Sequence, residues 1–306
     1  MAPMTAINVW FLHLEEALRE RVAPAIRQLR TRYSRVILPT FLALFLIGVY
    51  VSLRVSNVAL ADLLFVPLIG VFLGALATTV SNAWGLQLIA SYSAVRLSFR
   101  DAVLVSSFGS LSNILPIPGS ILVRGGALVS RGATVKQSAT GIALAAVIWI
   151  GLAGLVTGLA LATQGAALGW PAVLLCGLLS IAALGRLALQ GNARLAAAFL
   201  VQRAVMLSIT VLRFWFGFQA VGASANLVEA ATFSVASVFG AVVAIVPAGL
   251  AVSEAMAAAL AGLTALSPAI VFIVVALNRV VGLLGNGAVF FVVNLCSITN
   301  ETGSDK

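Results

Sequence analysis

Charged residues are scarce in this sequence, and their scarcity excludes a soluble fold. Asp, Glu, Lys and Arg make up 9% of the 306 residues and hydrophobic residues make up 61%, whereas a soluble domain carries about 25% charged residues. The mean hydropathy is +1.12, and several apolar stretches exceed the roughly 20 residues that span a bilayer. A soluble core cannot absorb this much apolar surface. The sequence therefore predicts an all-α, polytopic membrane protein.

Residues that catalyse reactions or bind metals are also scarce. The two cysteines, Cys176 and Cys296, both lie in apolar stretches, which favours core packing over a disulfide framework or a metal site. The single histidine, His13, lies near the N-terminus, outside the predicted spans. The sequence has no phosphate-binding P-loop motif, no zinc-ligand spacing, no nucleophile–histidine arrangement and no carboxylate pair within one motif. We therefore expect a protein that is not an enzyme and that needs no cofactor or metal.

The charge that is present is mainly positive, with a formal net charge of +9. No platform of aromatic and basic residues is visible, so nucleic acid is not the expected partner. The positive charge indicates instead membrane topology and attraction to anionic lipids. Residues 1–34 are predicted to be a basic amphipathic segment on the cytoplasmic membrane face, with a solvated basic tail as the alternative. A single transmembrane domain is expected over residues 35–297, followed by a polar tail over 298–306.

Six stretches are long and apolar enough to cross a bilayer. They cover approximately residues 36–53, 60–95, 135–162, 170–190, 195–220 and 268–295. Two further segments, about 101–131 and 227–266, are apolar but are interrupted by proline and glycine. Non-helical backbone at membrane depth is tolerated only where it is buried in protein or lines a cavity. We therefore expect about six full spans plus two broken, re-entrant helix hairpins.

The two interrupted segments share an ordered pattern of residues. The breaks, which would also supply the hinges, are expected at Pro116, Pro118 and Gly119 in the first copy and at Pro247 and Gly249 in the second. In each copy six residues separate a Phe-Gly pair from the first of these prolines. From the glycine of the break onward, matching residues of the two copies lie 130 positions apart. This ordered spacing predicts an internal repeat.

Basic residues predict the orientation of the chain. With a cytoplasmic N-terminus and hairpins that return to their own side, Arg54 is the one basic residue in an outer loop. The loops and C-terminal tail that become cytoplasmic carry Arg96, Arg100, Arg131, Lys136, Arg186, Arg194 and Lys306. Three spans separate the two hairpins, and because three is odd the second hairpin is inverted relative to the first. We expect inverted-topology repeats in the plasma (inner) membrane, with both termini cytoplasmic and a site near the bilayer midplane.

Embedded charges mark the expected site. Arg124 and Glu254 occupy matching positions in the two copies, and pseudo-symmetry would bring them together at the midplane. They would form either a charged substrate site or gate, or a structural ion pair that pins the hairpins together.

Further polar residues lie in the first hairpin and in the spans that follow it. Arg213 and Arg279 make the embedded charge cationic, which suits a phosphate or another anionic headgroup because guanidinium groups bind phosphate through paired donors. For Arg213 an anchor at the outer interface is the alternative. Asn113 and Asn278 would either line a polar path or form helix–helix hydrogen bonds.

The two motifs together resemble the lysylphosphatidylglycerol synthase transmembrane-region family, whose members are described as flippase-like integral membrane proteins. The family's motifs are similar to N-x-L-P-G-x-x-G-E-x-x-R and P-x-G-L-G-V-x-E. The residues that carry the resemblance are Asn113-Ile114-Leu115-Pro116 with Gly119, Arg124 and Gly132, then Pro247 to Glu254 (PAGLAVSE), then Asn278-Arg279.

Three positions depart from these motifs. Ser120 and Ile121 stand where the family often has a glycine and an acid, and Ala251 replaces a glycine. The missing acid means that no headgroup specificity is implied. The resemblance covers about residues 35–297, so it implies the flippase-like membrane part and not the aminoacyltransferase domain of the larger members.

These observations predict a lipid translocase. It would move an anionic or phosphate-bearing lipid between leaflets, through a cavity lined by the two hairpins and without nucleotide hydrolysis. Its expected partners are membrane lipids, either an anionic phospholipid or a lipid-linked phosphate, with a second copy of the chain or a separate lipid-synthesis enzyme as a further partner. The alternatives are a small-solute secondary transporter built on the same inverted repeats, and an accessory membrane subunit of a lipid-linked synthesis enzyme.

Overall fold

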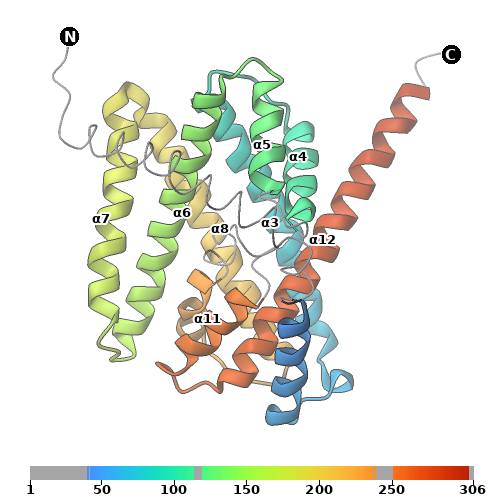
Figure 1. Cartoon of the computed structure of the whole chain (residues 1–306), viewed down its shortest axis with the longest axis vertical. Coiled ribbons are helices and arrows are strands. Elements are labelled where there is room, and N and C mark those ends of the chain that lie inside the picture. Colours follow the sequence, from blue (N-terminus) through green and yellow to red (C-terminus); the bar gives the residue numbers. More distant parts are fainter. Residues whose placement is uncertain (1–39, 41, 114–118, 237, 239–250, 303–306) are drawn as a thin grey trace.

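The computed structural model describes residues 40, 42–113, 119–236, 238 and 251–302. Within these residues every regular element is a helix (Figure 1). The elements are the helix Leu42–Ser56, η2 (Leu60–Asp62), α3 (Phe65–Tyr92), α4 (Phe99–Ser112), α5 (Gly119–Val129), α6 (Val135–Thr163), α7 (Gly169–Leu187), η3 (Ala188–Asn192), α8 (Ala193–Ala220), α9 (Leu227–Thr232), α11 (Val252–Ala261) and α12 (Pro268–Thr302). The predicted segment 1–34 and the expected breaks at Pro116, Pro118, Pro247 and Gly249 lie outside the described residues.

Five helices are long and apolar enough to cross a membrane, which supports the prediction of a helical, multi-pass membrane protein. They are Phe65–Tyr92, Val135–Thr163, Gly169–Gln190, Ala193–Ala220 and Pro268–Leu295. Each corresponds to one of the six predicted spans. For the first predicted span, the described part is the shorter apolar helix Leu42–Ser56. The first part of the predicted tail is helical, because α12 continues to Thr302.

The outer surface of the long helices is apolar. On the α7 side, Leu175 and Ile181 are about 70% exposed and Leu189 is 91% exposed. On α12, Leu284 and Phe291 are likewise exposed. A soluble protein does not present contiguous apolar faces of this extent to water. These faces match the hydrocarbon core of a bilayer, in agreement with the composition.

Small residues allow the helices to pack closely. A Cβ added at Gly158 on α6 would lie 2.8 Å from the backbone nitrogen of Val173 on α7, and one added at Gly154 would clash with the Cys176 side chain. Close approach at small residues is the usual way in which membrane helices associate, because lipid provides no hydrophobic driving force between them. The packing role expected for Cys176 agrees with this contact.

Within the first interrupted segment, the described residues form two short helices, α4 and α5, that pack against each other. Gly119, at the start of α5, lies so close to the carbonyl group of Ser112 at the end of α4 that a Cβ would clash with it. At the far end of the pair, Arg131 and Asp101 form an ion pair of 2.9 Å. With 14 and 11 residues, α4 and α5 are each too short for a hydrocarbon core of about 30 Å, given a rise of about 1.5 Å per residue.

The second short pair, α9 and α11, packs on different neighbours. The α9 side contacts α6, because the Thr157 hydroxyl lies 3.3 Å from the Ser234 hydroxyl and Gln164 donates to Thr232 at 2.9 Å. The α11 side packs along α12. Figure 1 shows α4 and α5 near one end of the molecule and α11 near the other. The α4–α5 pair and α11 therefore lie toward opposite ends of the molecule.

Candidate functional site

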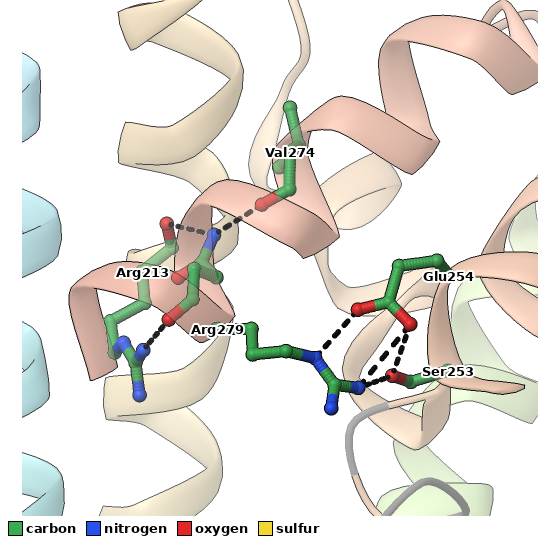
Figure 2. A network of polar contacts seen from close by, with 6 residues as sticks. Arg213, Ser253, Glu254, Val274 and Arg279 are labelled. Carbon is green, nitrogen blue, oxygen red and sulfur yellow. Dashed lines mark hydrogen bonds and ion pairs between the residues drawn. The ribbon is translucent and has the colours of Figure 1, made fainter. Parts of the chain in front are cut away.

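Glu254 and Arg279 form the buried ion pair of the interior. Glu254 lies in the first turn of α11 and is fully buried. Arg279 on α12 donates from Nε to Glu254 Oε1 at 2.7 Å and from Nη2 to Oε2 at 3.3 Å. Ser253 joins the pair, since its hydroxyl donates to Glu254 Oε2 at 3.1 Å and accepts from Arg279 Nη2 (Figure 2). A carboxylate in this setting requires such partners, because an uncompensated buried charge is costly.

The partner of Glu254 is therefore Arg279 and not Arg124, the residue at the matching position of the repeat. The packing explains the difference. α11 lies along α12, which carries Arg279. Arg124 belongs to the α4–α5 pair at the other end of the molecule. A sequence match between repeats gives equivalent positions but not the distance between them.

Arg213 and Asn278 connect α8 to α12 and α3. Arg213 donates from Nη2 to the Asn278 carbonyl at 2.8 Å and from Nη1 to the Thr78 hydroxyl at 3.2 Å. The Asn278 amide donates to the carbonyls of Val274 at 3.1 Å and Arg213 at 3.3 Å. Gly74 makes room for the Arg213 side chain, since a Cβ there would clash with its Cγ. Arg213 therefore lies between α8, α3 and α12, and Asn278 forms one hydrogen bond to α8 and one within α12.

Arg213 and Arg279 point away from each other. Asn278 and Arg279 are consecutive on α12, so their side chains leave the helix in different directions. Figure 2 shows Arg213 on one side of α12, while the Arg279 guanidinium extends to Glu254 on the other side. The described residues thus do not bring these two arginines to one point.

Arg124 on α5 lies against α4, and no carboxylate among the described residues forms an ion pair with it. Its Nε atom is buried and has no hydrogen-bond partner among the described residues. A Cβ added at Gly109 would lie 3.7 Å from this Nε, so the Arg124 side chain packs beside Gly109 of α4. Asn113 accepts a hydrogen bond from the Ser120 backbone nitrogen at 2.9 Å. In the structure Asn113 thus caps the start of α5, where helix N–H groups lack intrahelical partners.

Arg203 on α8 is an interior cation that the sequence did not predict as a site residue. It is only 8% exposed. Its Nη2 donates to the Ala145 carbonyl on α6 at 3.1 Å, and its guanidinium lies 5.4 Å from the centroid of the Trp149 ring. The Nε atom is buried and has no partner in the part of the chain that the structure describes. From the sequence alone, Arg203 is expected nearer the cytoplasmic end of its predicted span, where a long side chain could reach the interface.

A signal for the burial of Arg203 was nevertheless present in the sequence. Phe199, Leu207, Thr210 and Phe214 are buried on the same face of α8. Arg203 lies four residues after the first and four before the second, which is the helical spacing of a single stripe. A charged residue within an otherwise buried stripe indicates an interior position.

The remaining carboxylates whose side chains are described are engaged at helix ends. Asp62 accepts from the Ala59 nitrogen at 3.2 Å, and Glu229 accepts from the Asn226 nitrogen at 2.8 Å in a capping box. Asp101 lies outside the five candidate spans. The Ser98 hydrogen bond and the Arg131 ion pair hold the pKa of its carboxyl below its ordinary value. Among the described residues, no group of His, Cys, Asp and Glu side chains could hold a metal ion.

Comparison with models of known protein families gives no match, and comparison with curated protein sequences gives none either. The assignment of function therefore depends on the site itself. Its main feature is an interior that holds four guanidinium groups, those of Arg124, Arg203, Arg213 and Arg279, and one carboxylate, Glu254, among the described side chains.

Proposed function

We propose that this chain is a flippase-like translocase that moves an anionic or phosphate-bearing lipid between leaflets, with no catalytic reaction and no cofactor. The observation that carries the proposal is the buried Nε of Arg124, which has no hydrogen-bond partner among the described residues and lies on a helix too short to cross a bilayer. A phosphate would supply the missing charge and acceptor atoms. The resemblance to the lysylphosphatidylglycerol synthase transmembrane region supports the same function.

The surroundings of Arg124 favour a lipid over a water-soluble solute. Ile121 and Leu122, within one turn of Arg124 on α5, are exposed, and so is Phe108 on α4. If the headgroup phosphate of a lipid bound at Arg124, the acyl chains of that lipid would therefore lie against an apolar surface. A small hydrophilic solute would gain nothing from this surface, since the hydrophobic effect rewards the burial of apolar area only.

In the proposed mechanism, the two short-helix pairs act as inverted re-entrant hairpins that move against the long helices. Arg124 would receive the phosphate first. As α11 shifts, Arg279 would release Glu254 and bind the phosphate. The Glu254–Arg279 ion pair would form again when the lipid leaves. Arg213 and Asn278, each bonded to neighbouring helices, would hold α12 in register during this exchange. The location of the α4–α5 pair and α11 toward opposite ends of the molecule supports this arrangement.

The proposed location is the plasma (inner) membrane, with both termini cytoplasmic. Five helix ends that meet at one end of the molecule, those of α3, α4, α5, α6 and α7, are followed or preceded by basic residues, as the positive-inside rule requires of a cytoplasmic side. Single cysteines placed at Arg96 and at Arg54 test the orientation, each in a background without Cys176 and Cys296. A membrane-impermeant thiol reagent added to intact cells should label the cysteine at 54 only, and labelling at 96 would reverse the assignment.

Leaflet exchange in proteoliposomes tests the function. The exchange rates of labelled anionic, zwitterionic and lysyl-modified lipids are measured with the natural sequence and with Glu254→Gln. Glu229→Gln is the matched control, because a glutamine at position 229 preserves the capping box. We expect accelerated exchange of the anionic lipid, lost in Glu254→Gln and retained in the control. Exchange of no lipid by folded protein would exclude translocation. It would favour the solute-transporter or accessory-subunit alternatives.

A further inference from the structure

The charge of Glu254 is compensated by a single cation. Its carboxylate is fully buried and accepts side-chain hydrogen bonds from Arg279, at 2.7 and 3.3 Å, and from the Ser253 hydroxyl, at 3.1 Å. Of these two partners only Arg279 is charged, so the closed pair has a net charge of zero. A buried carboxylate keeps its negative charge only beside such a partner.

The helices around α11 offer no described substitute for Arg279. α11 packs along α12, and Ala257 and Ala261 of α11 share a buried apolar cluster with residues of α8 and α12 and with Phe233 at the end of α9. The other charged side chains described on these helices have contacts or positions of their own. They are Arg194, which is exposed, Arg203, which donates to the Ala145 carbonyl, Arg213, which bonds to Thr78 and Asn278 on the other side of α12 (Figure 2), and Glu229 in the α9 capping box.

Opening of the ion pair therefore calls for a proton. In the proposed mechanism Arg279 releases Glu254 and binds a phosphate. An ionised Glu254 would then be buried without a counter-charge, which is costly, and a buried carboxyl group in this situation takes up a proton instead. If the phosphate is a singly charged phosphodiester, its charge replaces that of Glu254 beside Arg279. The net charge of the site is then zero in both states.

Ser253 can serve Glu254 in both protonation states. In the closed pair the Ser253 hydroxyl donates to Glu254 Oε2 and accepts from Arg279 Nη2. When Arg279 leaves, the hydroxyl oxygen loses that donor, and a protonated Glu254 can donate to it, because a serine hydroxyl both donates and accepts. The carboxyl group thus keeps a hydrogen-bond partner whether it is ionised or neutral. Ser253 would act as a positioning residue.

We propose that Glu254 is a proton-binding site, that it takes up one proton when a singly charged phosphodiester binds at Arg279, and that lipid and proton cross the membrane together. This inference rests on the proposed function and names its coupling ion. The proton comes from water on the side to which the site is open. It returns to water when the lipid leaves and the Glu254–Arg279 ion pair forms again.

Titration calorimetry of the purified full chain in detergent counts the protons. Each ligand is titrated in two buffers that differ in ionisation enthalpy, because the difference in heat gives the number of protons taken up per ligand bound. The probes are dioctanoyl phosphatidylglycerol and dimethyl phosphate, a water-soluble diester. Neither probe has a second ionisation near neutral pH. Every protein carries His13→Gln, which removes the one histidine of the sequence and with it the side chain that ordinarily titrates there.

Binding of dioctanoyl phosphatidylglycerol should take up one proton, and its affinity should fall about tenfold for each unit rise in pH. Glu254→Gln should take up none and bind independently of pH, at least as tightly, because no carboxylate competes for Arg279. Glu229→Gln is the matched control, since Glu229 caps α9, and it should take up one proton. Dimethyl phosphate binding as tightly as the lipid would keep the proton site and reject a lipid as its ligand.

Two results would overturn the inference. One is binding without proton uptake by the protein that retains Glu254. The other is unchanged proton uptake by Glu254→Gln, which would assign the proton to another group. If Glu254→Gln fails to fold, the double substitution Glu254→Gln and Arg279→Gln removes both buried charges, and proton uptake by that variant would count equally against the inference.

A pH gradient across proteoliposomes separates the inference from the proposed function. Labelled phosphatidylglycerol should accumulate in the leaflet that faces the less acidic solution, because the lipid follows the proton. Leaflet exchange that ignores the gradient would leave translocation standing and refute the coupling. Proton uptake that depends on Glu254, in a protein that exchanges no lipid, would refute translocation and leave the proton-binding site standing.

Discussion

Glu254 and Arg124 are both interior charges, but they differ in whether a neighbour compensates them. Glu254 is bonded to Arg279 and Ser253. Arg124 has a buried Nε with no partner among the described residues. Removal of one member of a buried ion pair leaves the other charge buried without a partner. Removal of a charge that has no partner leaves no unpaired charge in the interior. The two residues should therefore respond to substitution in opposite directions.

The first prediction concerns the ion pair. Glu254→Gln and Arg279→Gln should each lower the free energy of unfolding by about 3–5 kcal/mol, because each leaves a buried charge without its partner. Denaturant or thermal unfolding in detergent measures the change, with Glu229→Gln as the control. The double substitution should recover part of the loss. Single substitutions as stable as the natural sequence would show that the pair does not hold α11 on α12.

The second prediction concerns the uncompensated charge. Arg124→Gln should raise the free energy of unfolding by about 1 kcal/mol or more in the absence of ligand, because the desolvation cost of the guanidinium disappears. The same unfolding measurement applies, with Arg54→Gln expected to change little because its charge is exposed. A loss of stability in Arg124→Gln as large as that in Arg279→Gln would mean that Arg124 is a structural residue. A residue that weakens the fold yet supports binding is typical of a functional site.

At the scale of the helices, the α4–α5 pair depends on one close approach that only glycine permits. A Cβ added at Gly119 would clash with the Ser112 carbonyl, whereas a Cβ added at Gly109 would make an ordinary van der Waals contact with the Arg124 guanidinium. The Asn113 side chain and the Asp101–Arg131 ion pair secure the two ends. The pair is thus a preformed unit that positions Arg124.

The third prediction tests this unit. Gly119→Ala should lower the free energy of unfolding by roughly 1–3 kcal/mol, because overpacking forces the backbone of α4 and α5 apart. Gly126→Ala on the same helix is the matched control. No atom lies within 4 Å of a Cβ there, so alanine should stabilise it by about 0.5–1 kcal/mol through helix propensity. Equal effects of the two substitutions would mean that α4 and α5 do not approach closely at Gly119.

The fourth prediction concerns the start of α11. Ala251 has a φ of 63°, in the left-handed region, and it stands where the resembled motif has glycine. An L-residue with a Cβ costs about 1–2 kcal/mol in this conformation. Ala251→Gly should therefore raise the free energy of unfolding by about 1 kcal/mol, whereas Ala255→Gly within the same helix should lower it by a similar amount. Destabilisation by Ala251→Gly would contradict the left-handed conformation.

The sequence predicted the helices better than it predicted their contacts. Five long helices and the α4–α5 pair follow from apolar length and from proline and glycine positions, which are local properties of the chain. The pairing of Glu254 with Arg279 and the burial of Arg203 are properties of packing. They depend on which helices are neighbours, and a repeat offset of 130 residues does not determine this.

At the scale of the whole molecule, side-chain hydrogen bonds join α3, α8 and α12 into a scaffold. Thr79 of α3 donates to the Asn286 side chain of α12 at 3.0 Å, and Gln202 of α8 donates to the Ser81 carbonyl of α3 at 2.8 Å. The bonds of Arg213 to α3 and α12 complete the set. Hydrogen bonds between membrane helices typically contribute about 0.6 kcal/mol each. The scaffold is therefore the part expected to stay fixed while the short pairs move.

This arrangement also explains why composition was informative about the environment but not about the substrate. The exposed apolar faces of α7 and α12 follow directly from the scarcity of charge. The site depends on a few interior cations, and the position of Arg203 along its predicted span did not distinguish it from a residue that reaches the interface. Only the stripe of α8 on which Arg203 lies separates the two cases.

Leaflet exchange of a labelled anionic lipid in proteoliposomes tests the central claim most directly, with the natural sequence, Arg124→Gln and Arg54→Gln reconstituted at equal density. The natural sequence and Arg54→Gln should accelerate exchange well above that of protein-free vesicles. Arg124→Gln, shown to be folded by its unfolding curve, should fall to the rate of those vesicles. Exchange by Arg124→Gln at the rate of the natural sequence would contradict the account.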